Sequence, residues 1–184
     1  MRRLIIVAAV AVAATGSFVY LQHTEPAWWA RIWYPLRYSS IVRAHAHNYD
    51  LNPALLAAVI DQESKFRADA KSSTGAIGLM QLQPATAEGI AIRTGGSKFV
   101  LSDLYNPEIN VRYGAWYLHH LLQKYGGDER LALAAYNAGQ ENVDRWRAKG
   151  EAVQFPETRA YVTHVERLKG IYRRTYSHEL GLSG

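Results

Sequence analysis

Apolar residues recur at helical spacing in four stretches of the chain, and each stretch begins at a helix-start signal. Asn52-Pro53 and Asn106-Pro107 place an amide before a proline, Asp128 follows Gly126-Gly127, and Pro156 precedes the last stretch. Three of these signals can cap a first turn, and the glycine pair ends the second helix. The apolar positions are Leu55, Leu56, Val59 and Ile60; Ile109, Tyr113, Trp116, Tyr117 and Leu121; Leu131, Leu133, Ala134 and Ala135; and Tyr161, Val165, Leu168 and Tyr172.

The rest of the pattern lacks the marks of a sheet protein. The chain shows no clear alternation of apolar and polar residues, no dinucleotide or phosphate loop, and no internal repeat. We therefore expect an all-α, mainly helical fold with one catalytic domain at residues 39–175. An aromatic and proline-rich lead-in at 25–38 precedes this domain, and a short tail at 176–184 follows it.

The first 24 residues differ from this domain. Arg2 and Arg3 precede Leu4–Leu21, which carries no charge and resembles the apolar region of an export signal. The stretch is also about long enough to span a bilayer as an uncleaved anchor. A small-x-small site at Ala11-Val12-Ala13 makes a cleaved signal peptide the preferred interpretation, with a retained inner-membrane anchor as the alternative. Either case predicts a protein of the periplasm or cell envelope.

Composition narrows the chemistry. The 184 residues include no cysteine, which removes thiol catalysis, disulfides and thiolate metal sites. The histidine pairs His45/His47 and His119/His120 are spaced so that neither places two rings on one helical face, and HExxH is absent. We expect no metal and no cofactor. The net charge of +5 suits an anionic partner such as a wall polymer or a membrane surface. Nucleic acid also fits the charge, but no motif supports it.

Glu63 is the candidate catalytic residue. It lies near the end of an apolar helix, on the same face as Leu56, Val59 and Ile60. Desolvation and the negative end of the helix should both raise its pKa, which would keep a proton available near neutral pH. The alternative is an exposed acid kept in water by its polar neighbours. Asp61, two residues away, should point elsewhere.

A loop of small residues follows and runs into an apolar turn. Its glycines, Gly75 and Gly78, let the backbone come close to another helix or to a ligand. Gln81 ends the turn with an amide that can bind a hydroxyl or an acetamido group. Helix packing and substrate binding both explain this segment.

These segments resemble the lytic transglycosylases of the soluble type, which have a goose-lysozyme-like fold. The matching motifs, in order, are Glu63-Ser64, Ser72, Gly78-Leu79-Met80-Gln81, Pro84-Ala85-Thr86-Ala87, Ala135-Tyr136-Asn137-Ala138-Gly139 and Glu157-Thr158-Arg159-x-Tyr161-Val162. The resemblance covers about residues 34 to 172. It implies cleavage of the bond between N-acetylmuramic acid and N-acetylglucosamine in peptidoglycan, with the muramyl C6 hydroxyl attacking C1 to leave a 1,6-anhydro sugar.

The resemblance also implies roles for single residues. Glu63 would act first as general acid and then as base, and Glu157 would position substrate. The remaining expected substrate-binding residues are Ser72, Gly78, Met80, Gln81, Tyr136, Asn137, Ala138 and Tyr161. Ser72 and Gln81 would hold sugar substituents, Met80 would line the cleft, and Tyr136 would lie close to Glu63. Asn137 would bind substrate or fix its loop.

Three alternatives stay open. A goose-type muramidase would use the same acid and pass the sugar to water. A non-catalytic wall-binding protein would keep the fold without turnover. A role beside a cell-envelope machine such as a secretion apparatus is compatible with the small size of the chain, as is general wall maintenance.

Overall fold

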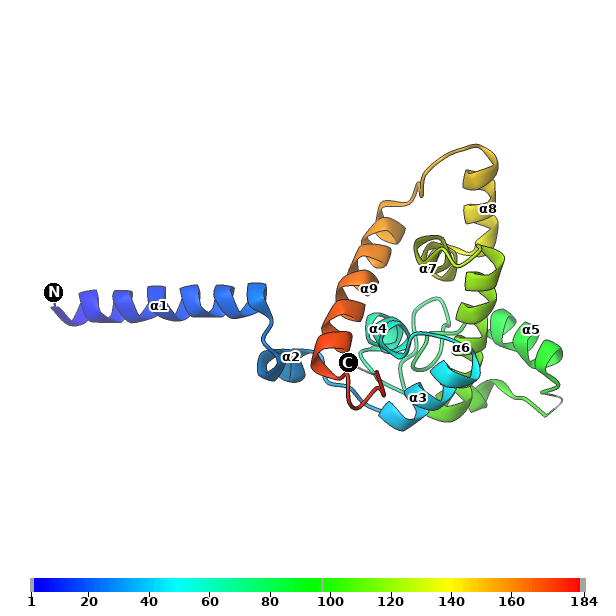
Figure 1. Cartoon of the computed structure of the whole chain (residues 1–184), viewed down its shortest axis with the longest axis horizontal. Helices are drawn as coiled ribbons and strands as arrows, with labels where there is room; N and C mark the ends of the chain where they lie inside the picture. Colours follow the sequence, from blue (N-terminus) through cyan, green and yellow to red (C-terminus); the bar gives the residue numbers. More distant parts are fainter. Residues whose placement is uncertain (1, 97, 183–184) are drawn as a thin grey trace. The chain divides into compact units, whose positions relative to one another are not determined.

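The structure is a computed structural model that describes residues 2–96 and 98–182. The chain divides into two compact units, residues 1–35 and 36–184. The first unit holds α1 (Arg2–Thr24) and α2 (Ala27–Trp33). The second holds α3 (Ser39–Asn48), α4 (Pro53–Ser64), α5 (Pro84–Thr94), η1 (Leu101–Tyr105), α6 (Pro107–Lys124), α7 (Glu129–Ala138), α8 (Gln140–Ala148) and α9 (Pro156–Thr175) (Figure 1).

The second unit is helical, as the sequence predicts. Among the described residues, extended pairing is confined to two isolated antiparallel bridges, Lys71 with Ile77 and Ile77 with Leu82. Both bridges lie in the loop between α4 and α5, where they fold the predicted small-residue segment back on itself. The helices α3, α5 and α8 and the short η1 were not anticipated from apolar spacing.

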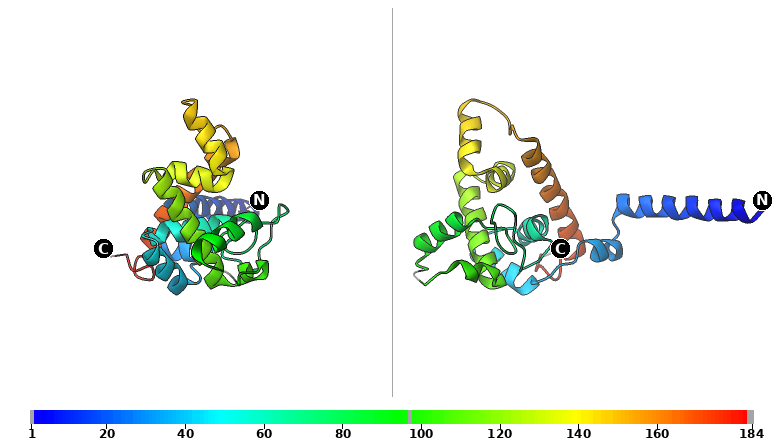
Figure 2. Two further views of the ribbon diagram at one scale, coloured as in Figure 1. Left: turned by 90° about the vertical axis from the view of Figure 1, so that its right-hand side faces the viewer. Right: turned by 180° about the vertical axis from the view of Figure 1, so that it is seen from behind.

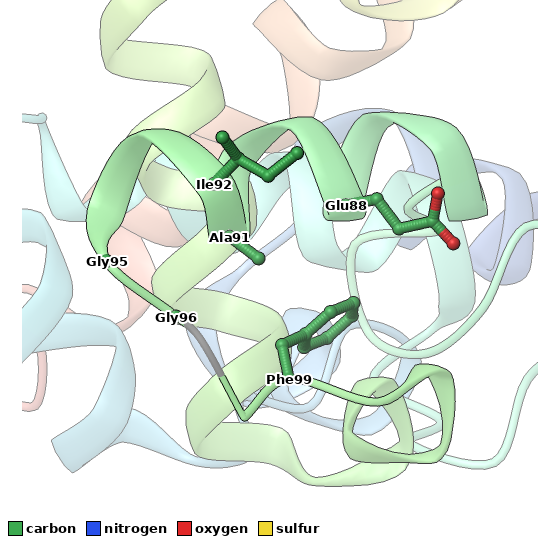
Figure 3. Close-up of a pocket in the computed structure, with 6 residues that line it drawn as sticks. All are labelled: Glu88, Ala91, Ile92, Gly95, Gly96 and Phe99. Atoms are coloured by element: carbon green, nitrogen blue, oxygen red, sulfur yellow. The ribbon is translucent and has the colours of Figure 1, made fainter.

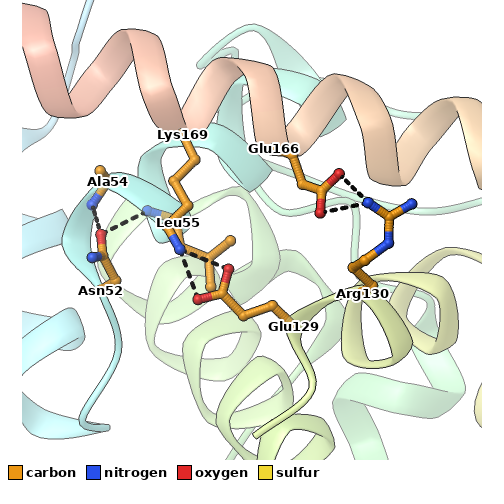
Figure 4. Close-up of polar contacts among 7 residues, drawn as sticks. All are labelled: Asn52, Ala54, Leu55, Glu129, Arg130, Glu166 and Lys169. Carbon is orange, nitrogen blue, oxygen red and sulfur yellow. Dashed lines mark hydrogen bonds and ion pairs between the residues drawn. The ribbon is translucent and has the colours of Figure 1, made fainter.

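The predicted helix starts are confirmed. Asn52 Oδ1 accepts from the backbone N–H groups of Ala54 and Leu55 at 2.9 and 3.2 Å (Figure 4). Asn106 caps α6 and Asp128 caps α7 in the same way, through side-chain oxygens that accept first-turn N–H groups. Each cap satisfies donors that have no partner within the helix, an effect of about 1 kcal/mol.

Helix α4 forms the core of the second unit. Its residues from Ala54 to Asp61 are all buried, and it packs against both α9 and α3. A helix that is apolar on every side must be surrounded by protein, and α4 is seen end-on between α9 and α6 in Figure 1. The last turn of α4 carries Glu63, whose side chain is half-buried between the buried Asp61 and Ser64.

Helix α7 contacts both α8 and α9. It lies between these two helices in both of two opposite views (Figures 1 and 2). Two ion pairs join it to α9: Glu129 with Lys169 and Arg130 with Glu166, each at 2.7 Å (Figure 4). Such partly exposed pairs contribute little to stability, from near zero to about 1 kcal/mol each. Their effect is to fix the register of α7 against α9, the two helices that carry Tyr136 and Tyr161.

In the first unit, α1 includes an apolar segment, Ile5–Gln22, that is long enough to cross a membrane. The segment has a mean hydropathy of 1.9, and none of it is buried. The ring of Phe18 meets the ring of Trp29 edge to face at 5.6 Å, so the end of α1 packs on α2. The lead-in aromatics thus make contacts within their own unit.

Candidate active site

Glu63 is the penultimate residue of α4, and the chain reverses direction directly behind it. Lys65 and Phe66 both adopt left-handed backbone conformations, with φ of 54° and 57°. The buried ring of Phe66 packs near that of Tyr172, with centroids 6.0 Å apart. Ser64 donates its hydroxyl to the carbonyl oxygen of Leu79 at 2.8 Å. These contacts end the helix at a fixed point and tie Glu63 to the following turn.

Two opposing effects set the proton affinity of Glu63. Burial raises the pKa of its carboxyl from 4.5 to about 7, and a hydrogen bond from Tyr161 lowers it in part. The Tyr161 hydroxyl donates to Glu63 Oε1 at 2.6 Å, which leaves Oε2 to carry a proton. A carboxyl of this kind is divided between its two protonation states near neutral pH, as an acid–base catalyst requires.

Asp61 lies apart from this pair. It is buried, and its nearest cation is Lys65, whose Nζ lies 3.5 Å from Oδ2. Burial raises the Asp61 pKa, and Lys65 opposes that rise. The structure therefore agrees with the expectation that Asp61 does not share a site with Glu63.

Asn110 on α6, which the sequence patterns did not single out, organises the turn that faces Glu63. Its Oδ1 accepts from the N–H of Met80 at 2.8 Å, and its Nδ2 donates to the carbonyl oxygens of Ile77 at 2.9 Å and Leu104 at 2.8 Å. The side chain has no exposed surface. A buried amide with three backbone partners is a strong local restraint.

Gly78 makes room for this amide. It has φ +80°, and a Cβ at this position would collide with the Asn110 side chain and the Leu104 carbonyl oxygen. The close approach at Gly78 is therefore made by protein, and a contact of its backbone with substrate stays a prediction. Gly75 has φ +89° and open space where a Cβ would lie, so its positive φ rather than close packing requires glycine in this turn.

Gln81 and Ser72 both form hydrogen bonds within the loop itself. Gln81 has φ 47°, and its Nε2 donates to the carbonyl oxygens of Gly78 at 2.9 Å and Ala70 at 3.2 Å. Ser72 Oγ accepts from the N–H of Ala76 at 2.9 Å. These bonds orient both side chains, and the acceptor oxygen of the Gln81 amide makes none of them. Their role as sugar-binding groups stays a prediction.

Met80 and Tyr136 connect the turn to α7. The Met80 side chain is fully buried against Gly114 of α6, so its backbone carbonyl, rather than its thioether, meets the site. The Tyr136 hydroxyl donates to that carbonyl oxygen at 2.8 Å. Burial, and then the neighbouring Glu63, raise the Tyr136 pKa well above its ordinary value. The proximity of Tyr136 to Glu63 is thus present in the structure.

The remaining predicted residues frame the junction of α7 and α9. Thr158, which is buried, donates to Asn137 Oδ1 at 2.8 Å, so Asn137 fixes this junction. The carbonyl oxygen of Ala138 accepts from Asn142 Nδ2. Glu157 is exposed in the first turn of α9. It lies four residues before Tyr161 and therefore on the same helical face, one turn away.

Two of the hollows in the described part of the chain are lined by residues of α5 itself. The larger, about 500 Å³, lies between α5 and the segment that follows it and is lined by Glu88, Ala91, Ile92, Gly95, Gly96 and Phe99 (Figure 3). Glu63 takes no part in it. The smaller, about 140 Å³, lies between α5 and α6 and includes Tyr117. The Tyr117 ring contacts that of Tyr136 at 5.5 Å, so this hollow adjoins the Glu63 site.

Residues 40–157 match the family model described as Transglycosylase SLT domain. The chain belongs to this family. The match covers well over half of the chain and includes Glu63, the turn at Gln81 and Tyr136. No group of three or more metal-binding side chains occurs within residues 2–96 and 98–182.

Relatives and solved structures agree with this family. The chain is 31% identical over 156 residues to the soluble lytic murein transglycosylase of Salmonella typhimurium, covering 76% of this chain and 23% of that protein. A segment of 99 residues, half of this chain and 18% of that protein, is 40% identical to the membrane-bound lytic murein transglycosylase F of Yersinia enterocolitica.

Two solved structures resemble this chain. An inactive glutamate-to-glutamine mutant of Pseudomonas aeruginosa Slt superposes with a TM-score of 0.75 at 32% identity, over 84% of this chain and 26% of that one. The 70 kDa soluble lytic transglycosylase of Escherichia coli gives 0.76 at 28% identity, over 85% and 27%. The mainly helical, lysozyme-like fold class is confirmed. The chain spans about a quarter of the length of these relatives.

Proposed function

We propose that this chain is a peptidoglycan lytic transglycosylase in which Glu63 is both general acid and general base. One observation carries the proposal: the half-buried Glu63 carboxyl at the end of α4 accepts a hydrogen bond from Tyr161 and has its pKa raised to about 7. The names of the relatives, lytic murein transglycosylases, support the reaction class, and the inactive glutamate-to-glutamine mutant of the Pseudomonas aeruginosa enzyme supports a glutamate as its centre.

In the first step, protonated Glu63 donates its proton to the glycosidic oxygen between muramyl and glucosaminyl sugars. The bond from the muramyl C1 to that oxygen breaks, and the N-acetylglucosamine side leaves as an alcohol. Tyr161 donates to Oε1 throughout, so it stabilises the carboxylate that forms as Oε2 loses its proton. The muramyl 2-acetamido group would stabilise the positive charge that develops at C1.

In the second step, the ionised Glu63 accepts the proton of the muramyl C6 hydroxyl while that oxygen bonds to C1. The products are a 1,6-anhydromuramyl end and a protonated Glu63 ready for the next cycle, with no water consumed. An intramolecular nucleophile needs no second protein carboxylate beside C1, and its proximity is worth several kcal/mol. The arrangement of Asp61, bonded away from Glu63, fits this scheme better than a two-carboxylate glycosidase.

The surrounding residues would hold the glycan. Tyr136 and Tyr161 lie beside Glu63, and each combines an aromatic ring with a hydroxyl, which suits the mixed apolar and polar faces of a sugar. Glu157, exposed one turn before Tyr161, is placed to bind a sugar substituent rather than to attack C1. Gln81 would offer its amide oxygen to an acetamido N–H.

Product analysis separates this reaction from hydrolysis by a muramidase. Purified sacculi are digested with the wild-type chain, and the fragments are measured by mass spectrometry. We expect 1,6-anhydromuramyl ends, which are lighter than reducing ends by one water. Reducing ends alone would refute the transglycosylase reaction and favour the muramidase. Glu63→Gln should bind sacculi and release no fragments; wild-type turnover in that variant would refute the role of Glu63.

The substrate also places the reaction outside the cytoplasm. Peptidoglycan lies in the cell envelope, and the apolar N-terminal helix α1 is compatible with export of the second unit. We therefore propose that the catalytic unit acts in the periplasm. Detection of an epitope fused after residue 184 in intact and in permeabilised spheroplasts tests this location.

A further inference from the structure

The aromatic helix α2 has an apolar face that nothing in its own unit covers. Trp28 is 56% exposed, Ile32 64% and Trp33 51%. Trp28 and Ile32 are four residues apart, so they share one side of the helix. Trp29 packs between Phe18 of α1 and Trp33, which joins α1 and α2 through aromatic contacts. Large exposed aromatics on a continuous face call for a covering partner.

The helix before α2 identifies what that partner is. None of the apolar segment Ile5–Gln22 of α1 is buried, and its 18 residues rise about 27 Å, close to the ~30 Å hydrocarbon core of a bilayer. Tryptophans are enriched where a spanning helix leaves this core, because the indole has both an apolar body and a polar N–H. The tryptophans of α2 follow the span by only a few residues.

We propose that α1 is a retained membrane anchor and that α2 lies in the headgroup region of the same bilayer, with Trp28, Ile32 and Trp33 inserted. Arg2 and Arg3 at the opposite end of α1 keep the N-terminus on the cytoplasmic side by their positive charge. The span then places α2, and the catalytic unit after it, on the outer face. Arg31 of α2 adds attraction to anionic headgroups.

The same features argue against removal of residues 1–24. The uncharged stretch Leu4–Leu21 exceeds the 7–15 residues of a usual signal h-region. The small residues Ala11-Val12-Ala13 lie in the middle of the continuous helix α1. Cleavage there would leave Phe18, Val19 and Tyr20, together with the tryptophans of α2, in water.

The short connection after α2 limits how far the catalytic unit can lie from the membrane. Only residues 34–38 separate α2 from α3, the first helix of the catalytic unit. Such a segment spans about 20 Å when fully extended. The catalytic unit would therefore begin close to the membrane surface and would cut the glycan nearest to it.

For the test, the full chain is expressed in cells and recovered from washed membranes, and its molecular mass is measured by mass spectrometry. We expect a protein that retains residues 1–24 and stays in the membrane after alkaline carbonate extraction. A processed chain in the soluble fraction would overturn the proposal.

The second measurement locates α2. The chain is reconstituted in phosphatidylethanolamine–phosphatidylglycerol vesicles that carry bromine either just below the headgroups or near the acyl ends. We expect tryptophan emission to be quenched by the shallow bromines more than by the deep ones. The double variant Trp28→Ser, Trp33→Ser should lose most of the shallow quenching and remain membrane-bound through α1. The control Trp146→Phe, a buried change on α8, should keep it.

Two results would overturn the interfacial position of α2. Emission that neither bromine quenches would mean that protein, rather than lipid, covers Trp28 and Trp33. Shallow quenching that survives in the double variant would mean that these two side chains do not supply it.

Discussion

Replacing Glu63 by glutamine should stabilise the fold, and the gain should depend on pH. In the folded chain the Glu63 pKa is about 7, against 4.5 for the unfolded group. Between these values the folded state binds the proton that the unfolded state has released. Raising the pH favours the state that binds fewer protons, and between pH 4.5 and about 7 that is the unfolded state. The free energy of unfolding must therefore fall as the pH rises through this window.

The size of the effect follows from the two pKa values. Each pH unit between them corresponds to about 1.4 kcal/mol, so the rise from 4.5 to about 7 costs about 3 kcal/mol of stability above pH 7. Below pH 4.5 both states are protonated and the cost disappears. Glutamine has nearly the same shape, cannot ionise, and can still accept the Tyr161 hydroxyl through its amide oxygen. Glu63→Gln should therefore match the wild type at pH 4 and exceed it by about 3 kcal/mol at pH 8.

The assay is thermal unfolding of the full chain in a mild detergent, followed by near-ultraviolet circular dichroism at several pH values from 4 to 8. A gain of this size in a unit of about 150 residues raises the midpoint by roughly 6–12 °C at pH 8. Asp61→Asn is a comparison on the same helix. A difference between wild type and Glu63→Gln that stays constant from pH 4 to 8 would refute the raised pKa and the role drawn from it.

Three further changes test the parts around the acid. Tyr161→Phe removes the hydrogen bond to Glu63, so the alkaline limb of the kcat/KM profile, expected near pH 7, should move up by about one pH unit. Tyr136→Phe should lower the rate and leave that limb in place. An equal shift of the limb in both variants would contradict the assignment. Asn110→Ala leaves buried backbone groups at the turn without partners and should cost about 2–4 kcal/mol in denaturant unfolding; a loss below 1 kcal/mol would contradict its structural role. Gly78→Ala forces a Cβ against Asn110 at positive φ and should destabilise the chain by several kcal/mol on the same assay, so wild-type stability would contradict the close approach.

The sequence predicted the helices whose signals are local. Asn52, Asn106 and Asp128 cap α4, α6 and α7 as expected, because an N-cap bond involves only residues two or three positions apart. It did not predict α3, α5 or α8 from spacing. Helix α8 is mostly polar, and Val143 and Trp146 are its only buried residues among those described. Such helices are stabilised chiefly by tertiary packing, which a local pattern does not record.

The residues of the candidate site differ in the same way: some could be predicted from local sequence, and others depend on tertiary contacts. The position of Glu63 at the end of an apolar helix could be read locally, and so could the raised pKa that burial produces there. The bond from Tyr161, 98 positions along the chain, could come only from the fold or from a family resemblance. Asn110 was missed because two of its three backbone partners, in Met80 and Ile77, lie 30 and 33 positions away, and an asparagine inside a helix carries no sign of such contacts.

These contacts explain how an acid that weakens the fold stays in place. The burial that costs about 3 kcal/mol at neutral pH is the same burial that, in the proposed reaction, would keep the Glu63 proton available for a leaving oxygen. The hydrogen bond from Tyr161 to Oε1 at 2.6 Å holds the Glu63 carboxyl, and turning the carboxyl outward would break that bond. Ser64, bonded to Leu79, and Asn110, bonded to Met80, fix the end of α4 and the turn that follows it. The rigid turn thus keeps the carboxyl in the environment that gives it its chemistry.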